Sequence, residues 1–330
     1  MNSWDPTQIL NLARNFMESR LLLSGAELDL FTLLTPKPLS AQEISTRIQA
    51  DPRGMTILLD ALSAMGLLTK REGTYECPPS ISALLSSDAP ESILPWVLHM
   101  AAVWKRWSLL TNITQGSQQP GLQVSPSQRM NEIRAFIGAM HLIASPLAPG
   151  IVAAVCPFSS RALLDVGGAM GTYTVAFLQA VPEMKATLFD RPEVIEIARP
   201  FLKSVGLLHR VTLVAGDFYQ DEFPKGHDLA FVSAIIHQNS SEQNLNLFLK
   251  AFRSLDSGGR VIIRDHVMDP DRTRPVEGAI FAVNMLVATT GGNTYTFDEI
   301  RAGLTQAGFI NIRLLQPGEH MDALVEATKP

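Results

Sequence analysis

The chain has 330 residues, 46% of them hydrophobic and 18% charged, with a formal net charge of -5. This length accommodates two domains of ordinary size, and the acidic balance argues against a general nucleic-acid-binding protein. The start of the chain lacks a basic segment and we find no apolar run of membrane-spanning length, so we expect a cytoplasmic protein that contacts neither nucleic acid nor membrane. Its two cysteines, Cys77 and Cys156, are expected to be free thiols.

The first third of the chain reads as helices followed by a small hairpin. Residues 5–34 predict two helices with more apolar surface than a terminal helix can bury in its own domain. Ser40 with Glu43 forms a capping-box pattern, and Asp51 caps a second helix that ends near Gly66, before a hairpin over 67–77. Helix, helix and hairpin are typical of a winged helix. Its second helix offers only Arg53 to a phosphate backbone, which favours a scaffold or dimerisation role.

Residues 91–156 predict helices rich in Met, Trp and His, interrupted by a polar linker over 115–127. Most of these large side chains fit ordinary core or interface packing. Trp104, Phe136 and Met140 are also candidates for the wall of a substrate pocket, because aromatic and methionine side chains suit an apolar ligand. We therefore expect a dimerisation domain over 1–110, a helical linker that contributes to the pocket over 111–160, and a third region over 161–330.

From residue 161 onward, strands and helices alternate, which predicts a parallel α/β sheet. The last two strands predict an antiparallel hairpin. Gly258-Gly259 is expected to end the helix over 241–254. The expected strands are 162–166, 185–190, 210–214, 228–236, 260–267, 309–316 and 321–328. The expected helices are 171–181, 191–205, 241–254, 275–289 and 297–307.

A glycine-rich turn follows the first of these strands, with glycines at 167, 168 and 171. It lacks the G-x-G-x-x-G register of dinucleotide sites and the Gly-Lys-Ser/Thr of a P-loop. Asp165, at the strand tip, is placed to attract a cationic group, and Asp190, at the end of the next strand, to accept from two ribose hydroxyls. A cationic nucleoside without phosphates is indicated, and S-adenosylmethionine has this description.

Motifs in a fixed order then carry a family resemblance. After the winged-helix start come Leu164-Asp165-Val166-Gly167-Gly168, Phe189-Asp190-Arg191-Pro192, Ala215-Gly216-Asp217-Phe218, Ile236-His237 and Gly291-Gly292. Together they resemble the dimeric small-molecule O-methyltransferases of the caffeic acid and acetylserotonin type, over nearly the whole chain. The resemblance implies a Rossmann-like class I methyltransferase domain, an N-terminal all-α, winged-helix dimerisation domain and a homodimer that methylates a small molecule.

The resemblance also implies residue roles. Gly167, Gly168 and Gly171 would lie under the methionine and ribose of S-adenosylmethionine, and Asp190 would hold the ribose. Asp217 and Phe218 would flank the adenine. His237 falls on the general base and Asp265 on the acid that orients it. S-adenosylhomocysteine would be the product.

The chemistry of these residue types supports the base independently. A sulfonium methyl is already activated, so the protein must supply alignment and a deprotonated nucleophile. Histidine suits proton removal near neutral pH, and a carboxylate on its far nitrogen would fix the tautomer. His237 and Asp265 follow two successive parallel strands, at the edge where α/β sheets bind ligands. A surface histidine at a strand end is the simpler alternative.

Several positions depart from the family pattern. Ala169 replaces a third glycine, Ser233 replaces a lysine beside the cofactor, and Gln238-Asn239-Ser240-Ser241 replaces Asp-Trp-Ser-Asp. Thr294 stands where the family has a second acidic partner of the base. Tyr295 is a candidate source of a hydroxyl in the pocket. We expect the substrate to contact Thr294, Tyr295, and, on the helix over 275–289, Asn284 and Met285.

Other functions remain open from the sequence. Methyl transfer to sulfur, nitrogen or carbon would suit the altered surroundings of His237, since a thiol needs little help from a base. A cofactor-binding DNA regulator without catalysis is a further alternative. No metal is expected, because His227, Asp228 and His266 lack the spacing of a ligand set.

Overall fold

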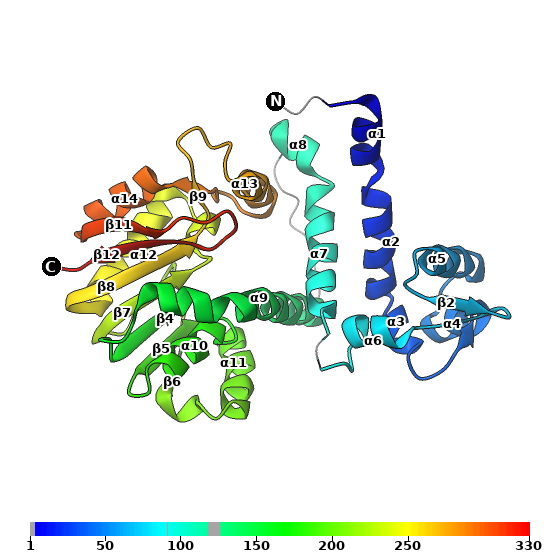
Figure 1. Cartoon of the computed structure of the whole chain (residues 1–330), viewed down its shortest axis with the longest axis horizontal. Coiled ribbons are helices and arrows are strands. Elements are labelled where there is room, and N and C mark those ends of the chain that lie inside the picture. Colours follow the sequence, from blue (N-terminus) through cyan, green and yellow to red (C-terminus); the bar gives the residue numbers. More distant parts are fainter. Residues whose placement is uncertain (1–3, 91, 118–125) are drawn as a thin grey trace. The chain divides into compact units, whose positions relative to one another are not determined.

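The computed structural model describes residues 4–90, 92–117 and 126–330, which form two compact units (Figure 1). One unit comprises Met1–Lys105 with Ser125–Ala139, and the other comprises Arg106–Val124 with Met140–Pro330. The polar linker expected over 115–127 lies largely outside the described residues. The division of the chain at residues 110 and 160 into regions with separate functions stays a prediction.

Over the described residues, the N-terminal unit contains seven short or medium helices, the first half of the long helix α9 (Pro126–Val155), and a three-stranded sheet in the order β1-β3-β2. The sequence predicted two helices over 5–34, but the structure has three. The chain breaks at Asn15, between the first two helices, and again at Asp29, whose φ of 52° is left-handed. The elements are α1 (Pro6–Arg14), α2 (Phe16–Glu27), α3 (Leu30–Leu33), β1 (Leu39–Ser40), α4 (Ala41–Ile48), α5 (Pro52–Ala64), β2 (Thr69–Arg71), β3 (Thr74–Glu76), α6 (Pro79–Leu85) and α7 (Leu94–Trp107).

Local signals place α4 and α5 of this unit as the sequence predicted. Ser40 and Glu43 form the capping box at the start of α4, and Asp51 caps α5. A single core holds the unit together, with Phe31 and Leu59 among its fully buried residues. The helices and hairpin of the winged-helix pattern are thus all present.

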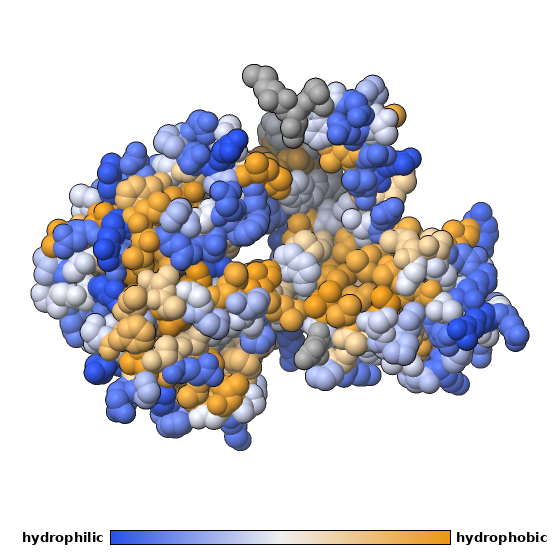
Figure 2. All heavy atoms as spheres, viewed as in Figure 1, coloured by the Kyte–Doolittle hydropathy of each residue, from blue (hydrophilic) through white to orange (hydrophobic). Residues whose placement is uncertain are grey.

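Large apolar side chains nevertheless remain exposed along α1 and the beginning of α2. They include Leu10, at 67% exposure, together with Ile9, Leu12, Phe16 and Met17. Figure 2 shows further apolar surface over the part of this unit where α2 and α7 lie. As expected from the sequence, this end of the chain carries more apolar surface than its own unit buries.

The second unit is built on a seven-stranded sheet in the order β11-β12-β8-β7-β4-β5-β6. The five strands from β8 to β6 are parallel, and β12 and β11 complete the sheet as an antiparallel hairpin. This confirms the predicted α/β sheet and its terminal hairpin. The strands are β4 (Ala162–Val166), β5 (Lys185–Asp190), β6 (Val211–Ala215), β7 (His227–Ser233), β8 (Leu255–Asp265), β11 (Ile310–Gln316) and β12 (Ala323–Thr328).

Helices cover both faces of this sheet, as a parallel sheet requires (Figure 1). The last turns of α9 with α10 and α11 pack on one face, and α12 with α14 pack on the other. Gly258-Gly259 lies inside β8 and does not close α12, which ends earlier, at Ser254. The helices are α8 (Leu110–Thr114), α9 (Pro126–Val155), α10 (Thr172–Ala180), α11 (Pro192–Ser204), α12 (Ser241–Ser254), α13 (Val276–Ala288) and α14 (Phe297–Gln306).

Helix α9 corrects one expectation from the sequence. An 18-residue window within its segment Arg129–Val155 has a mean hydropathy of 1.6, so by length and composition it could cross a membrane. Its last turns instead bury Ile151, Val152 and Val155 against the sheet, in one core with Phe177 and Phe231. One helix of this length and composition is weak evidence for a membrane span.

Candidate active site

The glycine turn between β4 and α10 brings the backbone close to the underlying strands. A Cβ atom on Gly168 would lie 2.8 Å from the side chain of Leu188 and 3.0 Å from that of Asp165, so any larger residue would have to displace them. Ala169 has a φ of 51°, the left-handed conformation that glycine adopts at lower cost. Its N–H donates to Asp190 Oδ2 at 2.8 Å, and this bond ties the turn to the end of β5.

The two carboxylates near this turn differ in their surroundings. Asp190 accepts from the backbone of Ala169 and, at 2.7 Å, of Arg191; burial raises its pKa, and these bonds oppose the shift. Each of its oxygens keeps a lone pair for a ligand hydroxyl. Asp165 is only 2% exposed and accepts from Thr174 Oγ1 at 2.6 Å, and burial raises its pKa to about 6. Asp165 therefore lies buried beneath the turn and binds the start of α10 through Thr174, whereas the sequence predicted an accessible charge.

A third part of this edge follows β6. Asp217 accepts from the backbone of Tyr219 at 2.9 Å, and Lys250 Nζ donates to the carbonyl oxygen of Phe218 at 2.8 Å. Phe218 is half-buried against the core. Because β4, β5 and β6 are parallel neighbours, the glycine turn, Asp190 and this loop all lie at the carboxyl edge of the sheet.

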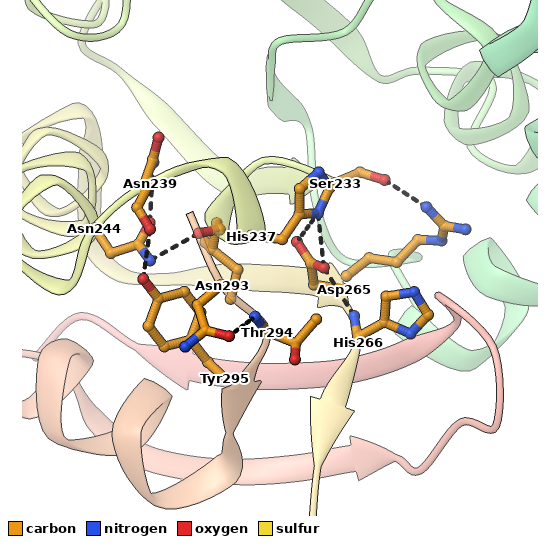
Figure 3. A network of polar contacts seen from close by, with 11 residues as sticks. Ser233, His237, Asn239, Asn244, Asp265, His266, Asn293, Thr294 and Tyr295 are labelled. Atoms are coloured by element: carbon orange, nitrogen blue, oxygen red, sulfur yellow. Dashed lines mark hydrogen bonds and ion pairs between the residues drawn. The ribbon is translucent and has the colours of Figure 1, made fainter. Parts of the chain in front are cut away.

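The structure brings His237 and Asp265 into direct contact (Figure 3). His237 lies in a 3-10 turn (Ile236–Gln238) after β7, and its Nδ1 is 2.9 and 3.0 Å from the oxygens of Asp265, the last residue of β8. Nε2 has no hydrogen-bond partner among the described residues. Burial by itself would raise the pKa of Asp265, but the adjacent His237 and the hydrogen bonds to the carboxylate hold that pKa below its ordinary value.

Backbone geometry on both sides fixes where His237 lies. Before it, Ala234 has a left-handed φ of 57° and donates its N–H to the carbonyl oxygen of Arg264 at 2.8 Å. After it, the N–H of Asn293 donates to the carbonyl oxygen of His237 at 2.8 Å. A Cβ atom on Gly292 would lie 2.6 Å from that same oxygen, so only glycine allows this approach. Left-handed residues other than glycine are often found at functional sites.

The segment that carries Thr294 and Tyr295 reaches this site through a short parallel pairing. Strand β10 (Tyr295–Thr296) pairs with β9 (Val267–Met268), which closely follows Asp265. Thr294 is buried, and its N–H donates to Asn293 Oδ1 (Figure 3). The Tyr295 hydroxyl donates to the carbonyl oxygen of Asn239, so in this structure it holds the turn of the base.

The remaining predicted residues are distributed over both units. Ser233 accepts from Arg264 Nη1 at 3.1 Å, close to the base. On α13, Met285 is buried, and Asn284 Oδ1 accepts from Trp107 Nε1 at 3.0 Å. Met140 lies in the same unit as these residues. The N-terminal unit holds two further candidates, Trp104 and Phe136.

Several residues of the site were missed by the sequence reasoning. Phe281 of α13 packs edge-on against the His237 ring, with centroids 4.8 Å apart. Asn239, which the sequence marks only as a departure from a family pattern, is buried and bonded to Asn244, a buried residue that the sequence reasoning did not identify. Tyr219 was also missed, because its connection to the site depends on its hydrogen bond to Asn239, which only the structure shows. The sequence carries no direct signal for these partners, because the burial that makes the two amides require them is decided by the tertiary structure.

The described residues contain no cluster of three or more metal-ligating side chains. His227 and Asp228 have structural partners instead: His227 Nε2 contacts Thr187 Oγ1 at 2.9 Å, and Asp228 accepts from the backbone of Arg161. His266 is 1% exposed, and within the described part of the chain neither of its ring nitrogens has a hydrogen-bond partner; burial lowers its pKa.

Comparisons with known proteins agree on one kind of relative. The O-methyltransferase domain model matches residues 132–310, and the O-methyltransferase dimerisation domain model matches residues 10–87. The tetracenomycin polyketide synthesis 8-O-methyl transferase TcmO of Streptomyces glaucescens is 31% identical, over 93% of this chain and 92% of its own. The 3-hydroxy-5-methyl-1-naphthoate 3-O-methyltransferase of Streptomyces sahachiroi is 28% identical, over 94% and 91%. The structure of PigF with SAH has a TM-score of 0.85 at 26% identity and covers 99% of this chain and all of that one.

Proposed function

The chain belongs to the O-methyltransferase family, an S-adenosylmethionine-dependent enzyme family, and we propose that it methylates a phenolic hydroxyl on a fused-ring aromatic or polyketide-type metabolite. The observation that carries the proposal is the buried contact between His237 and Asp265, which leaves Nε2 of the histidine available as a base. The substrate class follows from the relatives, whose names specify a tetracenomycin polyketide and a hydroxynaphthoate.

The glycine turn fits the proposed cofactor. At Gly168 a side chain would collide with Leu188 and Asp165, so glycine keeps the backbone of the turn close to the strands beneath it. Gly167 and Gly171 would lie beneath the methionine and ribose, and Asp190 has lone pairs oriented by two backbone N–H groups to accept from the ribose hydroxyls. Asp217 and Phe218 would flank the adenine, and Ser233 would lie beside the cofactor. Asp165 would act indirectly, by supporting the turn through Thr174.

The proposed chemistry needs little from the protein beyond alignment and proton removal. S-adenosylmethionine supplies, when bound, a methyl group already activated on a sulfonium, and S-adenosylhomocysteine is left after transfer. Nε2 of His237 takes the proton of the acceptor hydroxyl as the oxygen becomes methylated. Asp265 accepts a hydrogen bond from the Nδ1–H group of His237, which holds the imidazole in the required tautomer and stabilises the imidazolium.

The rest of the proposal concerns the substrate and the assembly. The substrate would contact Trp104, Phe136, Met140, Asn284, Met285, Thr294 and Tyr295. Residues 1–110 would form the dimer interface through the exposed apolar side chains of α1, residues 111–160 would contribute to the pocket, and residues 161–330 would bind the cofactor. Two free cysteines are consistent with a cytoplasmic protein, and no nucleic acid or membrane enters the proposal.

Substitution of the base tests this function. His237→Ala should lower turnover of labelled S-adenosylmethionine by about 10²-fold or more, since general-base catalysis contributes this much, and should leave binding of S-adenosylhomocysteine nearly unchanged. The acceptors would be 3-hydroxy-5-methyl-1-naphthoate, N-acetylserotonin, and their thiol and amine analogues. His209→Ala, in the 3-10 turn (Leu208–Arg210) before β6, is the matched control.

Each result of this experiment has a defined meaning. Unchanged turnover in His237→Ala would exclude His237 as the general base. Transfer to the thiol or amine analogue alone would favour the alternative of sulfur or nitrogen methylation, which the altered residues after His237 make worth testing. No heat with S-adenosylhomocysteine in calorimetry would refute the cofactor site.

A further inference from the structure

The turn that carries His237 is held by a polar network centred on Asn239. This residue stands where the related family has tryptophan, and it is fully buried, with no exposed surface. A buried amide costs free energy unless its donors and acceptors are paired. Figure 3 shows that Asn239 lies with Asn244 and Tyr295 on the side of His237 away from His266.

Hydrogen bonds from this network reach the carbonyl groups on both sides of the base. Asn239 Nδ2 donates to Asn244 Oδ1 at 3.0 Å, and Asn244 Nδ2 donates to the carbonyl oxygen of Ile236 at 2.9 Å. The Tyr295 hydroxyl donates to the carbonyl oxygen of Asn239 itself. Since the carbonyl of His237 also accepts from Asn293, the backbone is fixed before, at and after the base.

The network extends to the loop that we assign to the adenine. The Tyr219 hydroxyl donates to Asn239 Oδ1 at 2.7 Å and so joins the β6 loop to the turn of His237. Within that loop the Tyr219 N–H donates to Asp217, and the Tyr219 ring lies 4.6 Å from that of Phe218, centroid to centroid. The residue next to the two adenine-flanking positions is therefore bonded directly to the segment that carries the base.

We propose that Tyr219 and Asn239 are positioning residues that couple occupation of the adenine end of the cofactor site to the placement of His237. This inference rests on the proposed function. A ligand that orders Asp217 and Phe218 also orders Tyr219, and through Asn239 it restrains the turn of the base. A base has to be held within about 0.5 Å of its productive position, so a restraint of this kind acts on the rate of proton removal.

The first test is a double-mutant cycle with Tyr219→Phe and His237→Ala. Tyr219→Phe deletes one hydroxyl from a side chain that is 47% exposed, so the variant is expected to fold. In the wild-type background it should lower kcat about fivefold, the value of one hydrogen bond, with the dissociation constant of S-adenosylhomocysteine nearly unchanged. In the His237→Ala background the same substitution should have no further effect, because the group that it positions is absent.

A second measurement needs no acceptor substrate. With S-adenosylhomocysteine bound, the NMR signal of the His237 ring carbon Cε1 should be sharp in the wild type and broadened by exchange in Tyr219→Phe. Tyr75→Phe is the matched control, since it removes a tyrosine hydroxyl that is bonded to Asp60 in the other unit. In this control the His237 signal should stay as sharp as in the wild type.

The outcomes separate this inference from the function on which it rests. An equal loss of kcat in both backgrounds, or equal line widths in Tyr219→Phe and wild type, overturns the coupling and leaves the methyltransferase intact. If the wild-type protein does not bind S-adenosylhomocysteine in calorimetry, the cofactor site itself is refuted, and the coupling with it.

Discussion

Replacing Asp265 by asparagine or alanine separates two contributions of this carboxylate to the base. One oxygen, Oδ1, accepts both from His237 Nδ1 at 2.9 Å and from the backbone N–H of His266 at 2.8 Å. The other, Oδ2, accepts from His237 Nδ1 at 3.0 Å. In Asp265→Asn, the His266 N–H selects the amide oxygen for the Oδ1 position, because an amide NH2 there would oppose another donor. Nδ1 of His237 can then still donate to this oxygen at 2.9 Å, against repulsion from the amide NH2 at the Oδ2 position, so the tautomer is retained and the negative charge is lost.

The size of the effect follows from this geometry. A hydrogen bond to a charged acceptor contributes about 1–2 kcal/mol more than a bond between neutral groups. Asp265→Asn should therefore lower kcat roughly tenfold. Asp265→Ala removes the acceptor as well, which frees the tautomer and the ring orientation. Its kcat should fall by about 10² to 10⁴.

The assay is the initial rate of transfer from labelled S-adenosylmethionine at saturating concentrations of both substrates. Calorimetry with S-adenosylhomocysteine serves as the control, since Asp265 does not belong to the glycine turn and binding should change little. A kcat in Asp265→Asn within twofold of wild type, or equal losses in the two variants, would refute this account of the carboxylate.

Three further predictions concern the turn and the approach to the base. Burial raises the pKa of Asp165 from 3.8 to about 6, so the folded protein keeps this carboxyl protonated to a higher pH than the unfolded chain does. The unfolding free energy should therefore be highest below pH 4 and decline as pH rises through about 6. In urea unfolding, the decline of the unfolding free energy from pH 4 to pH 7 should be smaller in Asp165→Asn than in the wild type, by about 3 kcal/mol at most. Equal declines in the two proteins would contradict this. Ala169→Gly should raise the unfolding free energy by roughly 0.5–1 kcal/mol, while the helical control Ala176→Gly lowers it. Gly292→Ala should lower kcat by about tenfold or more, whereas Gly150→Ala, whose Cβ would meet nothing within 4 Å, should leave kcat unchanged.

The strands of the second unit were predictable because their pattern is local. β4 (Ala162–Val166) and β5 (Lys185–Asp190) have the predicted limits, since a continuous apolar run between turn residues is typical of a strand covered on both faces. Helix starts were equally predictable where a capping residue stands three positions before its capping-box partner, as Ser40 does before Glu43. The N-terminal helices were harder, because the break at Asn15 interrupts an apolar pattern that continues on both sides of it.

By itself the sequence determined the succession of strands and helices along the chain and the glycine turn, because these follow from local periodicity. The pairing of His237 with Asp265 came from the family resemblance, supported by the rule that parallel strands end at a shared edge. Only the tertiary structure decided what surrounds them. Asp165 is buried under the turn, Tyr295 bonds to the turn of the base, and Tyr219 meets Asn239 across 20 residues of chain. Such contacts depend on how loops from different strands pack and satisfy each other's polar groups, and spacing along the chain does not encode that packing.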